Sequence, residues 1–259
     1  MATFLFDKII FGPVKSRRLG VSLGVNLLPT DSKVCSFDCI YCECGWTPRK
    51  RESKAKLPTR EQVAQKLKEQ LQQMKEAGEL PDVITFAGNG EPTLHPDFSG
   101  IIDDTLALRN QYAPHCRIAV LSNSTTIDRE PVFQALLKVE DNILKLDSAI
   151  AETVELLDCP MGRFDLQKVI ENLARFGPQA IIQTLFVRGS YKGQTIDNTT
   201  EPELEAWLNA LKTIRPRQVM IYTIDRDTPA QGLVKVPLEE LNRIAQRVQQ
   251  EGFDVQVSG

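Results

Sequence analysis

Apolar and polar residues alternate along the chain with a helical period in some segments and form short apolar runs in others. The segment after Thr59 shows the helical period. Thr59 with Gln62 three places later predicts a capping box, and Gly78 predicts the end of the helix. Between them the apolar residues recur every three or four positions: Val63, Leu67, Leu71 and Met74.

Short runs rich in Val, Ile and Leu predict the strands. They cover residues 20–28, 82–88, 117–123, 142–148, 180–187 and 218–224. Further helices are predicted near 97–112, 130–138, 165–176 and 238–251. Thr200 with Glu203 suggests a second capping box ahead of one more helix, and "FDVQV" is left over at the end. Apolar strands that alternate with amphipathic helices indicate an α/β fold with a parallel sheet covered by helices.

The pattern gives six β-α units over about residues 20–251, which can form an open doubly wound sheet or an incomplete barrel. No interdomain linker is visible, so residues 1–259 are expected to form a single domain, with a long loop at about 29–58. Cysteines follow the first strand, "GNGEP" the second and "SNS" the third. The carboxyl ends of parallel strands carry the active site in such folds, so the site is expected there.

Composition and charge argue against some classes of protein function. The chain has 259 residues, of which 42% are hydrophobic and 25% charged, as in an ordinary globular protein. A net charge of −3 argues against a general nucleic-acid-coating protein, although the basic run at residues 49–56 could form a local basic surface or a solvated connector. No apolar run suggests a membrane span or an export signal, so a cytoplasmic protein with reduced thiols is expected.

Three cysteines on one loop suggest a metal centre. Cys35, Cys39 and Cys42 have the spacing C-x3-C-x2-C. Structural zinc usually takes four ligands, often in two separated pairs, and Cys44 as a fourth ligand would give an unusually compact site. Three thiolates instead suit a [4Fe–4S] cluster in which one iron has no protein ligand. That open iron could bind a cofactor or substrate, so the spacing favours chemistry over electron storage, with zinc as the alternative.

The same residues carry a family resemblance. C-x3-C-x-aromatic-C, with Tyr41 as the aromatic residue, resembles the signature of the radical S-adenosylmethionine (SAM) superfamily. "FGPVKSRRLGVSLGVNLLP", "FAGNGEPTLHP", "KLDS" and "QTLFVRG" resemble the branch of Fe–S oxidoreductases related to the wyosine-forming tRNA enzymes, and the likeness runs from about Phe11 to about Pro229. The resemblance implies a partial (β/α)6 TIM-like barrel. It also implies reductive cleavage of SAM at a [4Fe–4S] cluster, which gives a 5′-deoxyadenosyl radical that abstracts hydrogen from a substrate.

The resemblance also assigns roles to individual residues. Cys35, Cys39 and Cys42 would be the cluster ligands, and the Tyr41 ring would lie against the SAM adenine. The residues expected to contact SAM at the ends of the second and third strands are Gly88, Asn89, Gly90, Glu91, Ser122 and Asn123. Those expected on the fourth, fifth and sixth strands are Lys145, Asp147, Gln183 and Tyr222.

Several further residues have two possible roles each. Lys145 and Asp147 alternate with leucines and should point to one face, where a structural ion pair is the alternative role. Arg17 and Arg18 could bind a carboxylate or phosphate or fix the cluster loop. Cys116 is expected in the core, and Cys159 could be a redox residue.

The sequence does not identify the substrate. Wyosine enzymes carry an auxiliary cluster with cysteines before the SAM motif, and no cysteine precedes Cys35 here. Cys44, Cys116 and Cys159 could replace them only if the fold brings them together. A small molecule or peptide is therefore favoured over tRNA, with electrons from a flavodoxin- or ferredoxin-type donor. The alternatives are a wyosine-type tRNA-modifying enzyme and an iron–sulfur electron-transfer or sensor protein without SAM chemistry.

Overall fold

A curved, mostly parallel sheet forms the centre of the molecule. The computed structural model describes residues 4–16, 18–49 and 56–259. Six strands pair in parallel and in chain order: β2 (Gly20–Val25), β3 (Val83–Phe86), β4 (Arg117–Ser122), β5 (Asp141–Lys145), β6 (Ala180–Tyr191) and β8 (Gln218–Thr223). All six predicted strands are therefore confirmed, and so is the parallel α/β fold.

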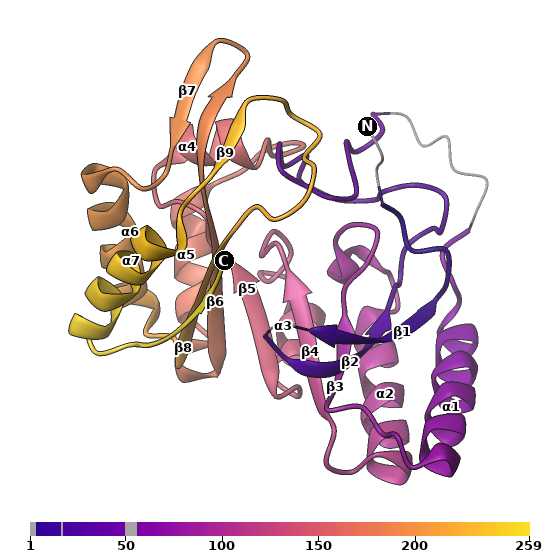
Figure 1. Cartoon of the computed structure of the whole chain (residues 1–259). Coiled ribbons are helices and arrows are strands. Elements are labelled where there is room, and N and C mark those ends of the chain that lie inside the picture. Colours follow the sequence, from indigo (N-terminus) through magenta and orange to yellow (C-terminus); the bar gives the residue numbers. More distant parts are fainter. Residues whose placement is uncertain (1–3, 17, 50–55) are drawn as a thin grey trace.

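Two more strands extend this sheet at its ends. β1 (Ile10–Ser16) pairs antiparallel with β2, and β10 (Asp254–Ser258) pairs parallel with β8. The strand order runs from β1 to β10 without closing into a ring, as in a partial barrel (Figure 1). Two short strands, β7 (Gln194–Asp197) and β9 (Leu233–Lys235), pair with the extended end of β6.

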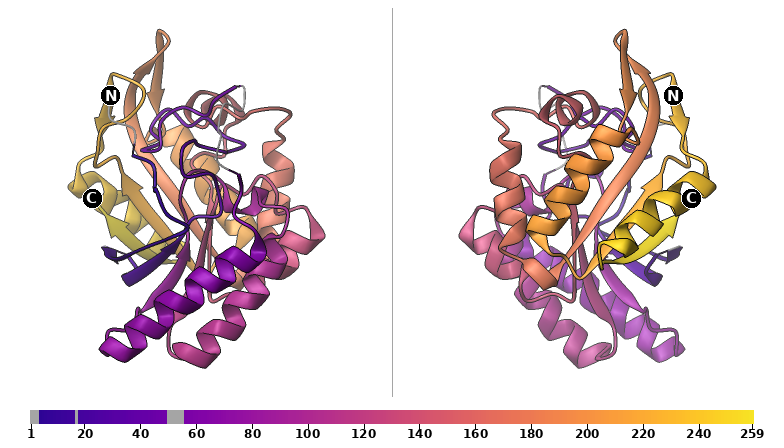
Figure 2. Two further views of the ribbon diagram at one scale, coloured as in Figure 1. Left: turned by 90° about the vertical axis from the view of Figure 1, so that its right-hand side faces the viewer. Right: turned by 90° about the vertical axis from the view of Figure 1, so that its left-hand side faces the viewer.

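The helices lie along the outside of the sheet, as the three views in Figures 1 and 2 show. They are α1 (Arg60–Ala77), α2 (Phe98–Tyr112), α3 (Glu130–Leu136), α4 (Ala151–Leu157), α5 (Leu166–Ala174), α6 (Glu201–Ile214) and α7 (Leu238–Gln250). Two 3-10 turns, η1 (Pro92–Leu94) and η2 (Gly177–Gln179), complete the connections. Among the residues that the structure describes, no helix is both long and apolar enough to cross a membrane.

One predicted capping box is confirmed and the other is wrong. The Thr59 side chain caps α1 together with Gln62, and Gly78 ends the helix in the left-handed conformation. Thr200 is the N-cap residue of α6 but makes no side-chain capping bond. Glu203 is buried, and its carboxylate accepts a hydrogen bond from Ser148 Oγ at 2.6 Å instead of bonding back to the helix start.

The elements that the sequence pattern missed are short or irregular. β1 contains the Gly12–Pro13 dipeptide, which is typical of a turn, and its pairing with β2 has a bulge there. α4 has only seven residues, and the predicted helix at 165–176 corresponds to α5 alone. The β7 and β9 pairings depend on contacts between segments distant in sequence, which periodicity does not reveal.

The two faces of the sheet have different side chains. The face toward the helices carries the main apolar core, with Leu23, Ile84 and Leu144 among its members. The opposite, inner face is filled near the amino ends of the strands by a small apolar cluster of Leu19, Val83, Ala119, Ile143, Ile181 and Met220. Because strand side chains alternate with period two, the next inward positions fall at the carboxyl ends of the strands. On β5, β6 and β8 these positions carry Lys145, Gln183 and Tyr222 of the candidate site.

Candidate functional site

The loop that follows β2 carries the three motif cysteines and is anchored to the end of β3. We call residues 29–49 the cluster loop. The Val34 amide donates to the Asn89 carbonyl at 2.9 Å, and the Glu91 amide donates to the Val34 carbonyl at 3.0 Å. A Cβ atom on Gly90 would lie 1.9 Å from the Val34 oxygen, and Gly90 has a φ of 129°. The glycine is therefore required by the close approach of the two backbones.

The other end of the cluster loop is anchored to the end of α4. The Asp38 amide donates to the Asp158 carbonyl and the Ile40 amide to the Leu157 carbonyl, both at 3.0 Å. The Met161 amide donates back to the Ser36 carbonyl at 2.8 Å. In Figure 1 this loop, drawn in indigo to purple, reaches from the β3 side of the sheet to α4. The cysteines are thus fixed at the carboxyl ends of the parallel strands, as the sequence predicts.

A buried lysine lies among the three cysteines. The Lys33 side chain is only 4% exposed, and its Nζ donates to the Gly45 carbonyl at 2.9 Å. Burial lowers the pKa of Lys33, but Cys42, Cys35 and Cys39 together outweigh this and hold it above its ordinary value. Lys33 therefore keeps its positive charge in the buried cluster loop.

The three thiols differ in their readiness to ionise. A hydrogen bond with the Cys44 thiol lowers the pKa of Cys42 to about 5, with help from Lys33 and against the effect of burial. Burial raises the pKa of Cys35 to about 11 and that of Cys39 well above its ordinary value. Of the three thiols, Cys42 therefore ionises most readily, and Lys33 favours its ionised form.

The donor set fits a thiolate-ligated cluster. Within the described residues, no three His, Cys, Asp or Glu side chains are close enough together to hold a single metal ion. Cysteines that each bind a different iron are held further apart than the ligands of one ion. Ligation requires all three thiols to lose their protons, and the Lys33 cation supplies local compensation for that negative charge.

Glu91 lies at the expected strand end but is engaged by its own neighbours. It is 2% exposed. Its Oε1 accepts from the Thr93 amide at 3.0 Å and from Thr93 Oγ1 at 2.6 Å, and its Oε2 accepts from the Asn123 amide at 2.6 Å. Burial raises its pKa against these hydrogen bonds. The Ser122 side chain is a fourth hydrogen-bond partner, so the roughly four acceptor positions of the carboxylate are all engaged within the chain, and its predicted contact with SAM stays a prediction.

Lys145 joins several predicted residues into one buried network. Its Nζ forms ion pairs with Asp147 and, at 2.8 Å, with Asp158 Oδ1. It also donates to the Tyr41 hydroxyl, which in turn donates to Asp147. Burial raises the pKa of Asp158 to about 7, with Lys145 opposing this shift. The structural ion pair and the position facing the site, which the sequence leaves as alternatives, are both present.

The remaining predicted residues surround this network. Gln183 is the β6 residue opposite Lys145, and Tyr222 follows on β8 with the Arg18 guanidinium 4.8 Å above its ring. Asn123 donates through Nδ2 to Cys35 Sγ at 3.4 Å. Ser122 is buried, and its hydroxyl accepts from the Ser124 amide at 3.1 Å, so it supports the turn that holds Asn123.

Some candidates lie elsewhere. Arg17, Lys50, Arg51 and Lys54 fall outside the described residues; Arg49 and Lys56 are described and exposed. Cys116 belongs to the main core at the amino end of β4, as expected. Cys44 contacts the Gly88 carbonyl at the other end of the strands, so Cys44, Cys116 and Cys159 do not form a common ligand set.

Two residues of the site, Lys33 and Asp158, were not predicted from the sequence. Lys33 precedes the first motif cysteine by two positions and resembles any loop lysine in the sequence. Asp158 ends α4, and its approach to Lys145 depends on how the cluster loop pairs with this helix end. A cation beside a cysteine motif is a usable signal for the first; local sequence offers none for the second.

Comparison with known proteins identifies the family of the chain. A family model described as "Radical SAM superfamily" matches residues 30–177, which include the three motif cysteines and the ends of β3, β4 and β5. The curated relatives include UPF0026 proteins of Methanocaldococcus jannaschii and Helicobacter pylori, each 31% identical to this chain. The matches cover 90% and 84% of this chain and 68% and 67% of those proteins. A protein named GTPase Obg from Brachyspira hyodysenteriae is 29% identical over 92% of this chain, and the chain spans only 33% of its length.

Solved structures share the fold at low sequence identity. A radical SAM methyltransferase from Sphaerobacter thermophilus has a TM-score of 0.66 and 16% identity, over 92% of this chain and 65% of its own. TYW1 with a lysine–pyruvate adduct has a TM-score of 0.58 and 14% identity, over 88% of this chain and 73% of its own. Streptococcus suis SuiB bound to the precursor peptide SuiA has a TM-score of 0.62 and 17% identity, over 91% of this chain and 48% of its own. The predicted partial barrel is confirmed by this shared fold.

Proposed function

The chain belongs to the radical SAM superfamily, and we propose that it is an enzyme that cleaves SAM reductively and abstracts a hydrogen atom from a substrate. Cys35, Cys39 and Cys42 would hold the [4Fe–4S] cluster. When bound, the cluster and SAM supply a one-electron cleavage that yields a 5′-deoxyadenosyl radical. The observation that carries the proposal is the buried Lys33 cation among three cysteines of one loop, at the carboxyl ends of six parallel strands.

The Lys145 network provides a charged, largely dry surface for SAM. Asp147 and Asp158 together carry two potential negative charges against the single cation of Lys145. Burial and the neighbouring Asp147 carboxylate raise the pKa of Asp158, and Lys145 opposes both effects. SAM is itself cationic at its sulfonium, so its binding beside this network supplies the missing positive charge. Tyr41, Gln183 and Tyr222 lie beside Lys145 and would border SAM bound there.

The proposal extends to the reaction class, the electron donor and the substrate. We favour an Fe–S oxidoreductase of the cytoplasm, with a flavodoxin- or ferredoxin-type protein as the electron donor. A small molecule or peptide is favoured over tRNA because the net charge is −3 and the remaining cysteines do not form the ligand set of a second cluster. The rival function is an iron–sulfur electron-transfer protein that does not cleave SAM.

One experiment separates these functions. The protein is reconstituted anaerobically with iron and sulfide, reduced with dithionite and mixed with SAM, and 5′-deoxyadenosine is measured by liquid chromatography. Wild type should form it and Cys39→Ala should not, while Cys159→Ala controls for the loss of a thiol outside the motif. A reconstituted wild type that holds iron but yields no 5′-deoxyadenosine would favour the electron-transfer function.

A further inference from the structure

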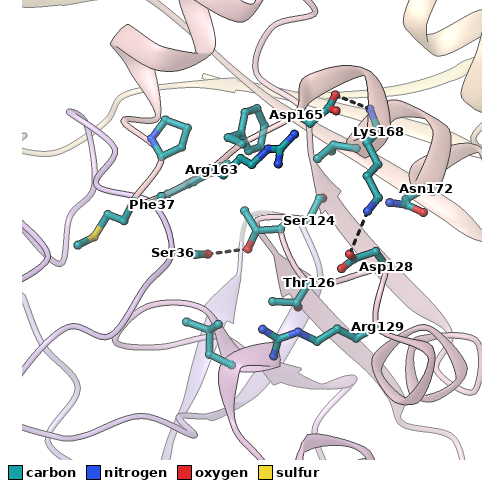
Figure 3. A pocket seen from close by; sticks show the side chains of 17 residues that line it. Ser36, Phe37, Ser124, Thr126, Asp128, Arg129, Arg163, Asp165, Lys168 and Asn172 are labelled. Carbon is teal, nitrogen blue, oxygen red and sulfur yellow. Dashed lines mark hydrogen bonds and ion pairs between the residues drawn. The ribbon is translucent and has the colours of Figure 1, made fainter.

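A cavity of about 500 Å³ opens beside the cluster loop (Figure 3). Ser36 and Phe37 of the cluster loop form part of its wall, and the rest comes from the β4–α3 and α4–α5 connections. The volume falls within the range of about 300–1,000 Å³ that is typical of small-molecule sites. None of the residues predicted to contact SAM lines it.

Hydrogen bonds connect this cavity to the first cluster cysteine. Asn123 Nδ2 donates to Ser36 Oγ at 2.8 Å as well as to Cys35 Sγ at 3.4 Å. Ser36 Oγ also shares a hydrogen bond of 2.6 Å with Thr125 Oγ1. A molecule in the cavity therefore lies against a wall that begins one residue from Cys35, where the radical chemistry is expected.

The wall also contains a strained residue. Ser124 has a φ of 68°, in the left-handed region that costs a serine about 1–3 kcal/mol. The turn is held by a bond from the Ser124 amide to Ser122 and by one from its hydroxyl to the Lys145 carbonyl. This strain places Thr125 and its neighbours at the cavity, as is common where backbone is shaped for a ligand.

The charges around the cavity are not balanced. Its charged side chains are Asp128, Arg129, Arg163, Asp165 and Lys168. The Lys168 Nζ lies 3.7 Å from Asp128, and Asp165 caps α5 by accepting from the Lys168 backbone amide at 3.1 Å. In the described part of the chain, no carboxylate pairs with Arg129 or Arg163. In Figure 3 these two arginines lie on opposite sides of the cavity. The wall therefore has three cationic and two anionic side chains, a net charge of +1, in a chain whose net charge is −3.

Apolar side chains complete the wall. Phe37 and Phe164 pack edge to face with ring centroids 5.5 Å apart, and Leu94 and Met161 lie on the same cavity. A suitable ligand therefore has both a charged group and a hydrocarbon portion, and the latter would supply C–H bonds.

We propose that this cavity binds the substrate and that the substrate is a small organic anion, whose carboxylate or phosphate groups are held by Arg129 on one side of the cavity and Arg163 on the other. Guanidinium groups match both anions through paired hydrogen bonds. The apolar part would then pack on the Phe37 side, toward the cluster loop. This inference rests on the proposed function, since it assigns the cavity to the substrate of that reaction.

The test uses anion binding to the purified protein. Isothermal titration calorimetry with inorganic phosphate and with citrate is run on wild type, Arg129→Gln and Arg163→Gln. Arg215→Gln is the matched control, because Arg215 is exposed at the end of α6, at the opposite end of the barrel. We expect saturable binding of at least one probe to wild type and control, weakened about tenfold in each cavity variant, the lower end of a hydrogen bond to a charged group. The tighter probe tells a phosphate site from a carboxylate site.

Three outcomes would overturn the inference: no saturable binding of either probe, equal affinity in all four proteins, or loss of SAM binding in the two cavity variants. The last outcome would assign the cavity to the cofactor. None of these readouts is the formation of 5′-deoxyadenosine, so this inference can fail while the proposed function stands. Conversely, a protein that binds the anions but does not cleave SAM would refute the proposed function alone.

Discussion

Replacing Gly90 with alanine tests whether the backbone contact between the β3 end and the cluster loop is needed for iron loading. The added Cβ would meet the Val34 carbonyl oxygen at 1.9 Å, so the loop must move. Two backbone hydrogen bonds at Val34 would be lost or stretched, at about 0.5–1.5 kcal/mol each. A positive φ adds a further cost of about 1–3 kcal/mol for any L-residue.

A second glycine variant separates the cost of backbone strain from the cost of the steric contact with Val34. Gly162 has a φ of 125°, close to the 129° of Gly90, but a Cβ there meets nothing within 4 Å. Gly162→Ala should therefore incur the backbone strain alone. The difference between the two variants should be about 1–3 kcal/mol, or roughly 2–12 °C in thermal midpoint for a chain of this size.

The assay combines thermal unfolding with iron analysis after anaerobic reconstitution. Gly162→Ala should load iron like wild type. Gly90→Ala should keep the circular dichroism of a folded α/β protein but lose most of its iron, because the loop that presents the cysteines is displaced. Equal iron content in the two variants would refute the claim that this contact positions the cluster loop.

Three further predictions concern the cluster, SAM and RNA. Wild type should contain about four irons and Cys39→Ala should lose them, which iron analysis checks; a wild type that holds only zinc would contradict it. Glu91→Gln should weaken SAM binding by on the order of 1.5–3 kcal/mol in equilibrium titrations while the cluster spectrum stays intact, and it keeps one oxygen for Thr93, which alanine would not. If tRNA binds through the basic run, its affinity should fall with salt at a log–log slope of roughly −3 to −4; sub-micromolar binding that neutralising the run abolishes would reverse the preference for a smaller substrate.

Sequence patterns predicted the barrel well because the features that define it are local. The six strands are continuous apolar runs, and α1 has both of its end signals in sequence. The second predicted capping box failed for a tertiary reason, since Glu203 is drawn to Ser148 by packing of α6 near the end of β5. β1 was missed because its Gly–Pro pair resembles a turn, while its pairing with β2 is non-local.

The candidate site was predictable to the extent that its residues belong to motifs at strand ends. Period-two alternation placed Lys145 and Asp147 on one face, and both are found in the same network. What Glu91 contacts was not predictable, because its partners come from the η1 turn and from the end of β4. Asp158 entered the network only through the pairing of the cluster loop with the end of α4.

The proposed substrate cavity illustrates why a sequence can reveal the class of reaction but not the substrate. Cluster ligands must be close in space and here lie within eight residues of each other, so they leave a motif. Arg129 and Arg163 come from different connections, and each resembles an ordinary exposed arginine beside a helix. Only the fold shows that they share a cavity and that Lys168 pairs with one of its carboxylates, Asp128. If this cavity binds the substrate, as we propose, recognition depends on loop residues that the superfamily motif does not constrain, and their exchange should change the substrate without affecting the cluster.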